Sequence, residues 1–347
     1  MSELSDGRSN GALRLGWTAL VEDYAIVCDW AMGGKVLLVG DAAGGLHCFD
    51  GKTGTLLWQQ SEQHDGSLLA MSVHPDGKSF ATAGQNGRVI IRYAQDGNKI
   101  TVSELSSDWV EHLAWSFDGQ WLAAACSRFV HVIGNDGQEK WRAEAHPSTV
   151  SALSWSNTNE LATACYGRVS FFDGSSGETT QKLEWKGSLI SMALSPDGDV
   201  VACGSQDNSV HFWRRSTEKD SMMSGYPTKP DSLAFNRNGS FLATGGGDTV
   251  IVWSFENGGP EGTRPGLLEI HDEPISSLSF APRGNRLASG AKDGGVVLWD
   301  LQADGAGNPI GAALMPDIVS AISWRPDGRM LGAVDARGNV NAWRVRT

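Results

Sequence analysis

The sequence lacks the features of exported and membrane-spanning proteins. It holds five Cys among 347 residues and no CxxC pair, which indicates buried, reduced thiols in place of a disulfide framework or a zinc site. The N-terminal MSELSDGRSNGA has no basic segment followed by an apolar one, and no apolar run approaches membrane-spanning length. We therefore expect a cytoplasmic protein that does not associate with membranes.

Basic charge is also scarce. The chain has 28 Lys and Arg against 40 Asp and Glu, a formal net charge of -12. A nucleic-acid footprint is basic and clustered, and attachment to an anionic membrane surface also needs cationic side chains. The composition therefore predicts neither nucleic acid nor a membrane as a partner.

Glycine and tryptophan, in contrast, are abundant, at 43 and 14 residues. Abundant Gly without helix-type periodicity indicates many tight turns and hence many short strands. The Ser, Gly and Asp content at the start predicts a disordered N-terminal tail over residues 1–11. Residues 12–347 are predicted to form a single domain.

One repeat returns eight times. The stretch LSPDGDVVACGSQDNSVHFW, from Leu194 to Trp213, combines a Pro-Asp-Gly turn, a small-residue strand, a polar turn and an alternating strand. The third residue of the first turn marks each repeat: Gly34, Gly77, Gly119, Asn159, Gly198, Gly239, Gly284 and Gly328. The markers lie 39 to 45 residues apart, which is the period of four-stranded propeller blades.

The eighth repeat has room for only two strands after Gly328, ending near Val345. An unmatched strand-like segment, ALRLGWTAL, lies at Ala12 to Leu20 and is predicted to complete the last blade. Such closure removes two exposed sheet edges. The sequence therefore predicts an all-β, eight-bladed β-propeller of four-stranded antiparallel blades around an axial channel.

These repeats resemble the WD-repeat β-propeller family. The stretch from Ile270 to Asp300 is similar to a near-consensus copy and contains the dipeptide Trp299-Asp300. The resemblance implies that His271, Ser289, Asp293 and Trp299 form a hydrogen-bonded structural network. Two earlier repeats contain degenerate copies. One has His64, Thr82 and Asn86 with Arg92 in place of Trp, and the other has His146 and Thr163 with Phe172.

Several constellations also allow a catalytic or metal-binding interpretation. Cys203 and His211 occupy repeat positions, which favours a structural role. The His271, Ser289 and Asp293 set has the residue types of a hydrolytic triad, but the network implied by the resemblance is favoured. His47, His131 and His211 share one column, but they fall in different blades, too far apart for ligand bonds of about 2 Å. We predict no catalytic residues, no metal site and no cofactor.

One segment supports an alternative. FDGKTGTLLW, from Phe49 to Trp58, resembles the blade motif of quinoprotein dehydrogenases, whose propellers bind a quinone and a metal. The chain has no adjacent Cys pair of the kind such enzymes use. A quinone-dependent oxidoreductase, and a small-molecule or metal site in the channel, remain the alternatives to a non-enzymatic protein.

The candidate binding surface lies on the loops before the first strands and on the turns between second and third strands. Exposed Trp, Tyr and Arg side chains there would suit partner binding, because these residues are enriched in interaction hot spots. The predicted set is Tyr24, Trp109, Arg128, Tyr166, Lys229, Lys292 and Arg337. The predicted function is a monomeric, non-enzymatic scaffold that docks partner proteins of unknown identity across the channel mouth.

Overall fold

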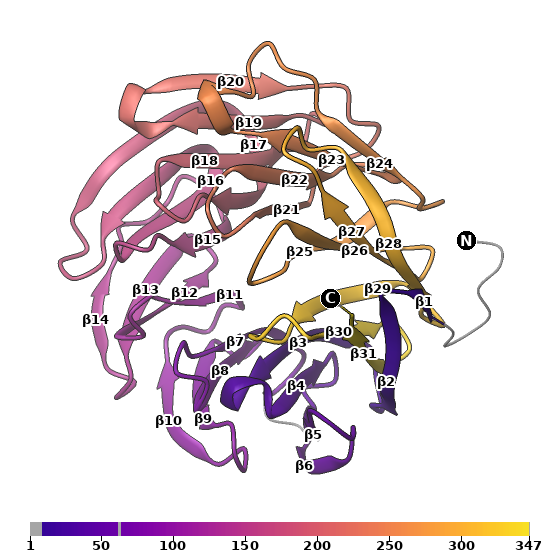
Figure 1. The fold of residues 1–347 in the computed structure, drawn as a ribbon. Coiled ribbons are helices and arrows are strands. Elements are labelled where there is room, and N and C mark those ends of the chain that lie inside the picture. The colour runs from indigo at the N-terminus through magenta and orange to yellow at the C-terminus, as the bar shows by residue number, and fades with distance from the viewer. Residues whose placement is uncertain (1–8, 62–63, 347) are drawn as a thin grey trace. The chain divides into compact units, whose positions relative to one another are not determined.

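The computed structural model describes residues 9–61 and 64–346. By internal contacts the chain divides into two units. The terminal unit comprises Met1–Asp41, His47–Leu57 and Gly225–Thr347, and the central unit comprises Ala42–Leu46 and Trp58–Ser224. Apart from three short 3-10 helices, the regular structure of the described residues is entirely β-strand, as Figure 1 shows. The predicted all-β class is therefore confirmed.

Four antiparallel sheets are built mainly from the terminal unit. Three contain four strands each and one contains five. The first is β3 (Ala25–Ala31), β4 (Val36–Asp41), β5 (Leu46–Asp50) and β6 (Leu56–Gln60), with helix η1 (Met32–Gly34) between β3 and β4. The second is β21 (Ser232–Phe235), β22 (Phe241–Gly245), β23 (Thr249–Ser254) and β24 (Gly266–Glu269), with η3 (Glu256–Gly258) after β23.

The other two sheets of the terminal unit use the start of the chain. The five-stranded sheet is β25 (Ile275–Phe280), β26 (Arg286–Ala291), β27 (Gly295–Leu301), β28 (Gly307–Leu314) and β1 (Ser9–Gly11). The last sheet is β29 (Val319–Trp324), β30 (Met330–Asp335), β31 (Asn339–Val345) and β2 (Leu13–Leu20).

The central unit holds three sheets. The four-stranded ones are β7 (Leu68–Val73), β8 (Ser79–Gly84), β9 (Arg88–Tyr93) and β10 (Lys99–Glu104), and β11 (Val110–Trp115), β12 (Trp121–Cys126), β13 (Phe129–Gly134) and β14 (Glu139–Arg142). The third has six strands: β15 (Val150–Trp155), β16 (Glu160–Asp173), β17 (Thr179–Leu194), β18 (Val200–Ser205), β19 (Val210–Arg214) and β20 (Lys219–Met223), with η2 (Arg215–Thr217) before β20.

The prediction of eight blades is wrong. The described strands form seven hydrogen-bonded sheets, because the fourth and fifth sequence repeats share the six-stranded one. Strands β16 and β17 each run through what was expected to be a break between elements, and they pair from Phe172↔Thr179 to Tyr166↔Ser188. The linker EWKGSL, residues 184–189, contains no Pro, and its Gly187-Ser188 pair does not end β17, so strand pairing continues through it. Counted as continuous sheets, the blades number seven.

The start of the chain completes the last sheet, as predicted. Strand β2 pairs with β31 in antiparallel register from Leu13↔Val345 to Leu20↔Asn339. Strand β1 pairs with the outer strand β28 of the neighbouring five-stranded sheet. Residues 9–11, which were predicted to belong to a disordered tail, therefore form a strand, and the remainder of that predicted tail lies outside the described residues.

A Trp near the end of several first strands connects neighbouring sheets within each unit. In the central unit, Trp115 Nε1 donates to Ser72 O at 3.2 Å and Trp155 Nε1 donates to Ala114 O at 2.9 Å. In the terminal unit, Trp324 Nε1 donates to Ser279 O at 3.0 Å. Each bond runs from the first strand of one sheet to the first strand of the preceding sheet. The repeated Trp therefore buries a large ring and satisfies its polar atom on a backbone carbonyl.

Candidate functional site

The structure brings together the four residues of the predicted network in the terminal unit. His271, in the loop before β25, lies with Nε2 2.8 Å from Ser289 Oγ on β26. Trp299 on β27 donates from Nε1 to the same oxygen, also at 2.8 Å. Asp293, in the turn between β26 and β27, has Oδ1 3.4 Å from His271 Nδ1. The Ser289 oxygen on β26 thus connects the loop before β25 with strand β27.

Asp293 also holds the loop and the turn through backbone bonds. It accepts from the backbone N–H of Asp272 at 2.9 Å and of Gly295 at 2.6 Å. Burial alone would raise the pKa of Asp293, but the hydrogen bonds from His271 and these N–H groups outweigh it and lower the pKa. Ser289 is fully buried, and its hydroxyl contacts both the His271 ring and the Trp299 ring. This arrangement favours a structural network over a hydrolytic triad.

The central unit carries degenerate copies. His64 lies with Nε2 3.1 Å from Thr82 Oγ1 and with Nδ1 3.1 Å from Asn86 Oδ1. Arg92 stands where Trp299 stands in the complete copy, and it is fully buried. Its Nη1 donates away from the histidine, to Gln60 Oε1 at 2.9 Å and to Gly97 O at 3.1 Å. Burial lowers the pKa of Arg92 to about 10.

The copy around His146 has no carboxylate. His146 Nε2 lies 2.8 Å from Thr163 Oγ1, and its ring packs against Phe172 with the ring centroids 6.0 Å apart. Burial is the largest cause that lowers the pKa of His146, the hydrogen bond to the Arg128 backbone opposes it, and together with the charges of nearby Arg168, Lys182 and Arg128 these bring the pKa to about 4. His146 is therefore neutral at neutral pH.

A further network escaped the sequence analysis. Tyr226 Oη lies 2.7 Å from Thr244 Oγ1 and accepts a bond from Trp253 Nε1 at 3.1 Å. Tyr226 precedes Thr244 by 18 residues, the spacing that also separates His64 from Thr82 and His271 from Ser289. This shared spacing was the signal that could have identified a tyrosine in the histidine position.

The cysteines offer no reactive thiol. All five are free and buried, and burial raises the pKa of Cys203, Cys28 and Cys48, the last to about 12. His211 pairs across strands with Cys203, and its ring lies between Trp185 and Trp213, with centroids 3.7 and 4.3 Å away. Over residues 9–61 and 64–346, no group of three His, Cys, Asp or Glu side chains could hold a metal ion.

The predicted binding residues of the terminal unit are all exposed. Tyr24 is 41% exposed in the loop before β3, and Lys229 and Lys292 lie in loops before β21 and after β26. Arg337, in the turn between β30 and β31, pairs through Nε with Asp317 Oδ2 at 2.7 Å. These residues lie at the strand ends opposite to the Pro-Asp-Gly turns, as the repeat register predicted.

The predicted residues of the central unit carry the larger rings. Trp109 is 52% exposed just before β11, and Tyr166 is 57% exposed in the middle of β16. Arg128 lies between β12 and β13, where its Nε donates to His146 O at 2.7 Å. The His146 ring is itself hydrogen-bonded to Thr163. The exposed Arg128 guanidinium is therefore connected through His146 to a buried hydrogen bond.

Two family models match the chain. The model described as "WD domain, G-beta repeat" matches residues 223–254 and 262–300. The model described as "Outer membrane protein assembly factor BamB" matches residues 14–222, more than half of the chain. Both matches follow the repeats found in the sequence. Among the described residues, no helix is long and apolar enough to cross a membrane.

Curated relatives match at low identity. "Actin-interacting protein 1" of Caenorhabditis elegans is 26% identical over 94% of this chain and 54% of its own length. "Cell division cycle 20.1, cofactor of APC complex" of Arabidopsis thaliana is 30% identical over 44% of this chain and 33% of its own length. "THO complex subunit 3" of the same plant is 28% identical over 55% of this chain and 63% of its own length. The chain thus spans between a third and two thirds of these relatives.

The fold is also found in a solved structure. The crystal structure of the computationally designed Ika8 protein matches with a TM-score of 0.80 at 21% identity, over 94% of this chain and 98% of that one. At this identity the similarity shows the fold alone. The repeats, the buried networks and the two model matches together show that the chain belongs to the WD-repeat β-propeller family and, over residues 14–222, also to the family that the BamB model describes.

Proposed function

We propose that the chain is a non-enzymatic scaffold that binds other proteins through the loops before its first strands and the turns between its second and third strands. The surface of the central unit is formed by Trp109, Arg128 and Tyr166, and that of the terminal unit by Tyr24, Lys229, Lys292 and Arg337. We further propose that the protein is a cytoplasmic monomer without cofactor. These assignments do not depend on the identity of the partner.

The observation that carries the proposal is the exposure of two large aromatic rings on this surface. Trp109 is 52% exposed to solvent and Tyr166 is 57% exposed. The backbone N–H of Tyr166 donates to Ser148 Oγ at 2.8 Å, so the ring extends from a fixed strand position. Rigid aromatic and arginine anchors lose little conformational entropy on binding and provide most of the binding energy at protein interfaces.

The relatives support the proposal through their names. "Actin-interacting protein 1", "cofactor of APC complex" and "THO complex subunit 3" all describe association with other proteins or complexes. The buried thiols and the buried Ser289 support the absence of catalysis, since a nucleophile must be accessible and activated.

The test compares two ends of one strand. Trp109 lies just before β11, and Phe117, which is 63% exposed, follows the other end of the same strand. We expect proteins co-purified with the wild type, quantified by mass spectrometry, to be lost from a Trp109→Ala/Tyr166→Ala variant. The matched control Phe117→Ala should keep them. An unchanged set of co-purified proteins in the double variant would refute this surface, as would an equal loss in the control.

A further inference from the structure

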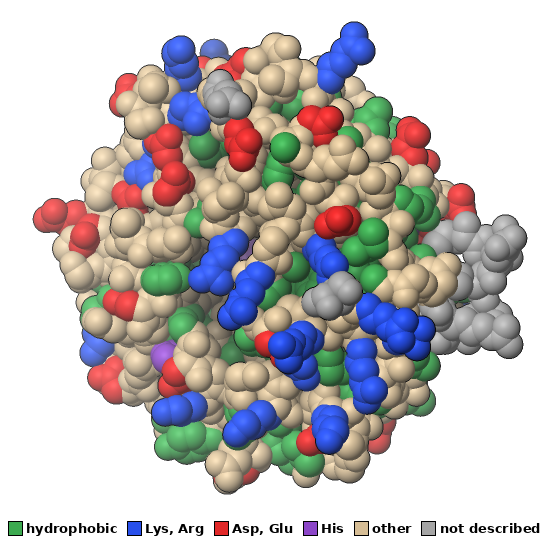
Figure 2. Space-filling view, viewed as in Figure 1, with side chains coloured by type: hydrophobic (Ala, Val, Ile, Leu, Met, Phe, Trp, Pro, Cys, Tyr) green, Lys and Arg blue, Asp and Glu red, His purple; other side chains and the backbone are tan. Residues whose placement is uncertain are grey.

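A cavity of about 890 Å³ lies in the terminal unit, at the strand ends opposite to the proposed partner loops. We call it the arginine pocket, and its lining residues are Lys52, Arg325, Arg329, Met330, Arg344, Val345 and Arg346. Among residues 9–61 and 64–346, the lining therefore contains five cations and no carboxylate. Figure 2 shows Lys and Arg side chains gathered on this face, over β29–β31 and β2.

The charge of the arginine pocket is opposite in sign to the net charge of the protein. The chain carries a formal net charge of -12, yet every charged side chain that the structure describes in the lining is positive. Among the described residues, Arg325 is the one lining cation with an ion-pair partner, Asp327. Arg344 stands opposite Arg14 in the β2–β31 register, and like charges in directly paired positions destabilise a sheet. An anion bound in the pocket would offset this repulsion.

Arg325 is held in place before any ligand arrives. Its Nε and Nη2 donate to the two carboxylate oxygens of Asp327, both at 2.8 Å. Its side-chain stem lies over Gly34, where an added Cβ would overlap Arg325 Cγ. Such a bidentate pair fixes the plane of the guanidinium group.

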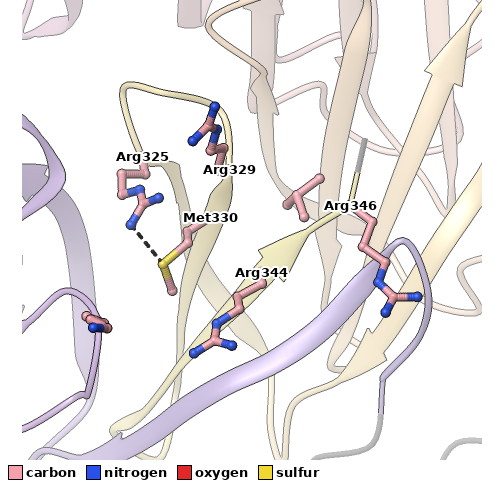
Figure 3. A pocket seen from close by; sticks show the side chains of 7 residues that line it. Arg325, Arg329, Met330, Arg344 and Arg346 are labelled. Atoms are coloured by element: carbon pink, nitrogen blue, oxygen red, sulfur yellow. Dashed lines mark hydrogen bonds between the residues drawn. The ribbon is translucent and has the colours of Figure 1, made fainter.

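The remaining nitrogen of Arg325 points to a poor acceptor. Nη1 donates to Met330 Sδ at 3.2 Å and to no oxygen among the described residues. A thioether sulfur accepts hydrogen bonds only weakly. In Figure 3 the Met330 side chain lies between the guanidinium groups of Arg325 and Arg344, and Arg329 extends from the same turn as Arg325. The Arg325 side chain is only 21% exposed, so its donor is partly desolvated and oriented toward the cavity floor.

We propose that the arginine pocket binds a small polyanion carrying two or more phosphate groups. The planar fork of arginine matches the geometry of phosphate oxygens, and several separate cations call for more than one phosphate group. The cavity volume falls in the range of small-molecule sites, and the buried side chains of Met330 and Val345 give it an apolar floor. The acidic remainder of the chain argues against a nucleic acid.

The experiment measures binding by isothermal titration calorimetry with three probes. Sodium tripolyphosphate represents a free phosphate chain, ATP a nucleotide and inositol hexakisphosphate a phosphorylated ring, and sodium sulfate serves as a single-anion reference. We expect at least one probe to bind more tightly than sulfate, and the tightest identifies the source of the phosphate groups. The proposal is overturned if none does.

Two double variants with the same charge change localise the site. Arg329→Gln/Arg344→Gln removes two pocket cations, and Arg264→Gln/Arg283→Gln removes two exposed cations of the same unit outside the pocket. The first pair should weaken binding of the preferred probe by about tenfold or more, and the second by less than about twofold. Equal weakening by both pairs would show a general charge effect and overturn the proposal. Thermal unfolding of each variant checks that it folds.

Discussion

Residues 262–300 and residues 14–222 contain the same buried motif in different states of completeness. In the first segment, Ser289 Oγ contacts both the His271 ring and the Trp299 ring at 2.8 Å. In the second, the threonine hydroxyls at residues 82 and 163 each contact one histidine and, at 3.5 Å, a backbone carbonyl. The bond from histidine to hydroxyl persists in both segments, whereas the tryptophan donor does not.

The tryptophan donor therefore distinguishes the two segments. Trp253 and Trp299, in the two stretches that match the WD model, both donate from Nε1 into their networks. In the segment matched by the BamB model, Arg92 and Phe172 occupy this position in the two repeats that keep the bond from histidine to threonine. A network that joins three elements through one oxygen leaves more groups unsatisfied when that oxygen is lost. The predictions below test this difference, from the largest expected effect to the smallest.

The incomplete copy at His146 should weaken the protein in acid. Its pKa of about 4 lies below the usual value of 6.5, so the unfolded state binds the proton first as the pH falls. The stabilising contribution of neutral His146 is fully present above pH 6.5 and is lost as the pH falls toward 4. The loss is on the order of 3 kcal/mol, since one pKa unit corresponds to about 1.4 kcal/mol.

Urea unfolding between pH 7 and pH 4 measures this loss. The free energy of unfolding of the wild type should fall more steeply over this interval than that of His146→Gln, which has no group to titrate at this position. Parallel pH profiles for the two proteins would show that His146 is not the source of the acid sensitivity.

Removal of the shared hydroxyl should cost more in the complete copy than in a degenerate one. Ser289→Ala leaves two buried ring nitrogens without their partner, and we expect a loss of about 2 kcal/mol. Thr82→Val removes the partner of one ring at similar side-chain volume, and we expect about 1 kcal/mol. Urea unfolding at pH 7 gives both values. A larger loss for Thr82→Val would contradict the proposed importance of the three-element network.

The repeats were predictable because their signals are local. The Pro-Asp-Gly turns, the small-residue second strands and the recurring Trp each identify an element from a few adjacent residues, and the pairing of β2 with β31 follows from the missing outer strand. The joining of β16 and β17 was not predictable in this way. It depends on pairing between Tyr166 and Ser188, which forms although Gly167 and Gly187 beside them are residues typical of turns.

The candidate sites were predictable only in part. The register placed Trp109 and Arg337 at exposed loop positions and Tyr166 at an exposed position, now within β16, because each follows from counting along one repeat. The arginine pocket was missed because Lys52 and Arg344 lie almost the whole chain apart and meet only after folding. The net charge of the chain is negative, and this total conceals a local excess of positive charge.

A carboxylate should make the copy at His64 resemble the complete one. Asn86 Oδ1 lies 3.1 Å from His64 Nδ1, and burial, as the largest cause, lowers the pKa of that histidine. In Asn86→Asp, a negative charge at this position would favour the protonated ring and raise its pKa. The free energy of unfolding between pH 6.5 and pH 5 should then fall less than in the wild type, by about 1 kcal/mol. NMR titration of His64 reports the same shift directly, and an unchanged His64 pKa would contradict it.

An effect of similarly small size is expected in the last repeat, which has the tryptophan but no hydroxyl. Trp343 is fully buried, and its Nε1 finds no hydrogen-bond partner among the described residues. Ala333 precedes it by ten residues, as Ser289 precedes Trp299, and occupies the corresponding position on the second strand. We expect Ala333→Ser to provide an acceptor for this donor and to raise the free energy of unfolding by about 1 kcal/mol.

Ala243→Ser is the matched control, because Ala243 is also fully buried on a second strand but lies next to the Thr244 position. If Ala333→Ser destabilises the protein as much as the control does, the serine and tryptophan pair requires the histidine as well, and the network cannot be built from two members.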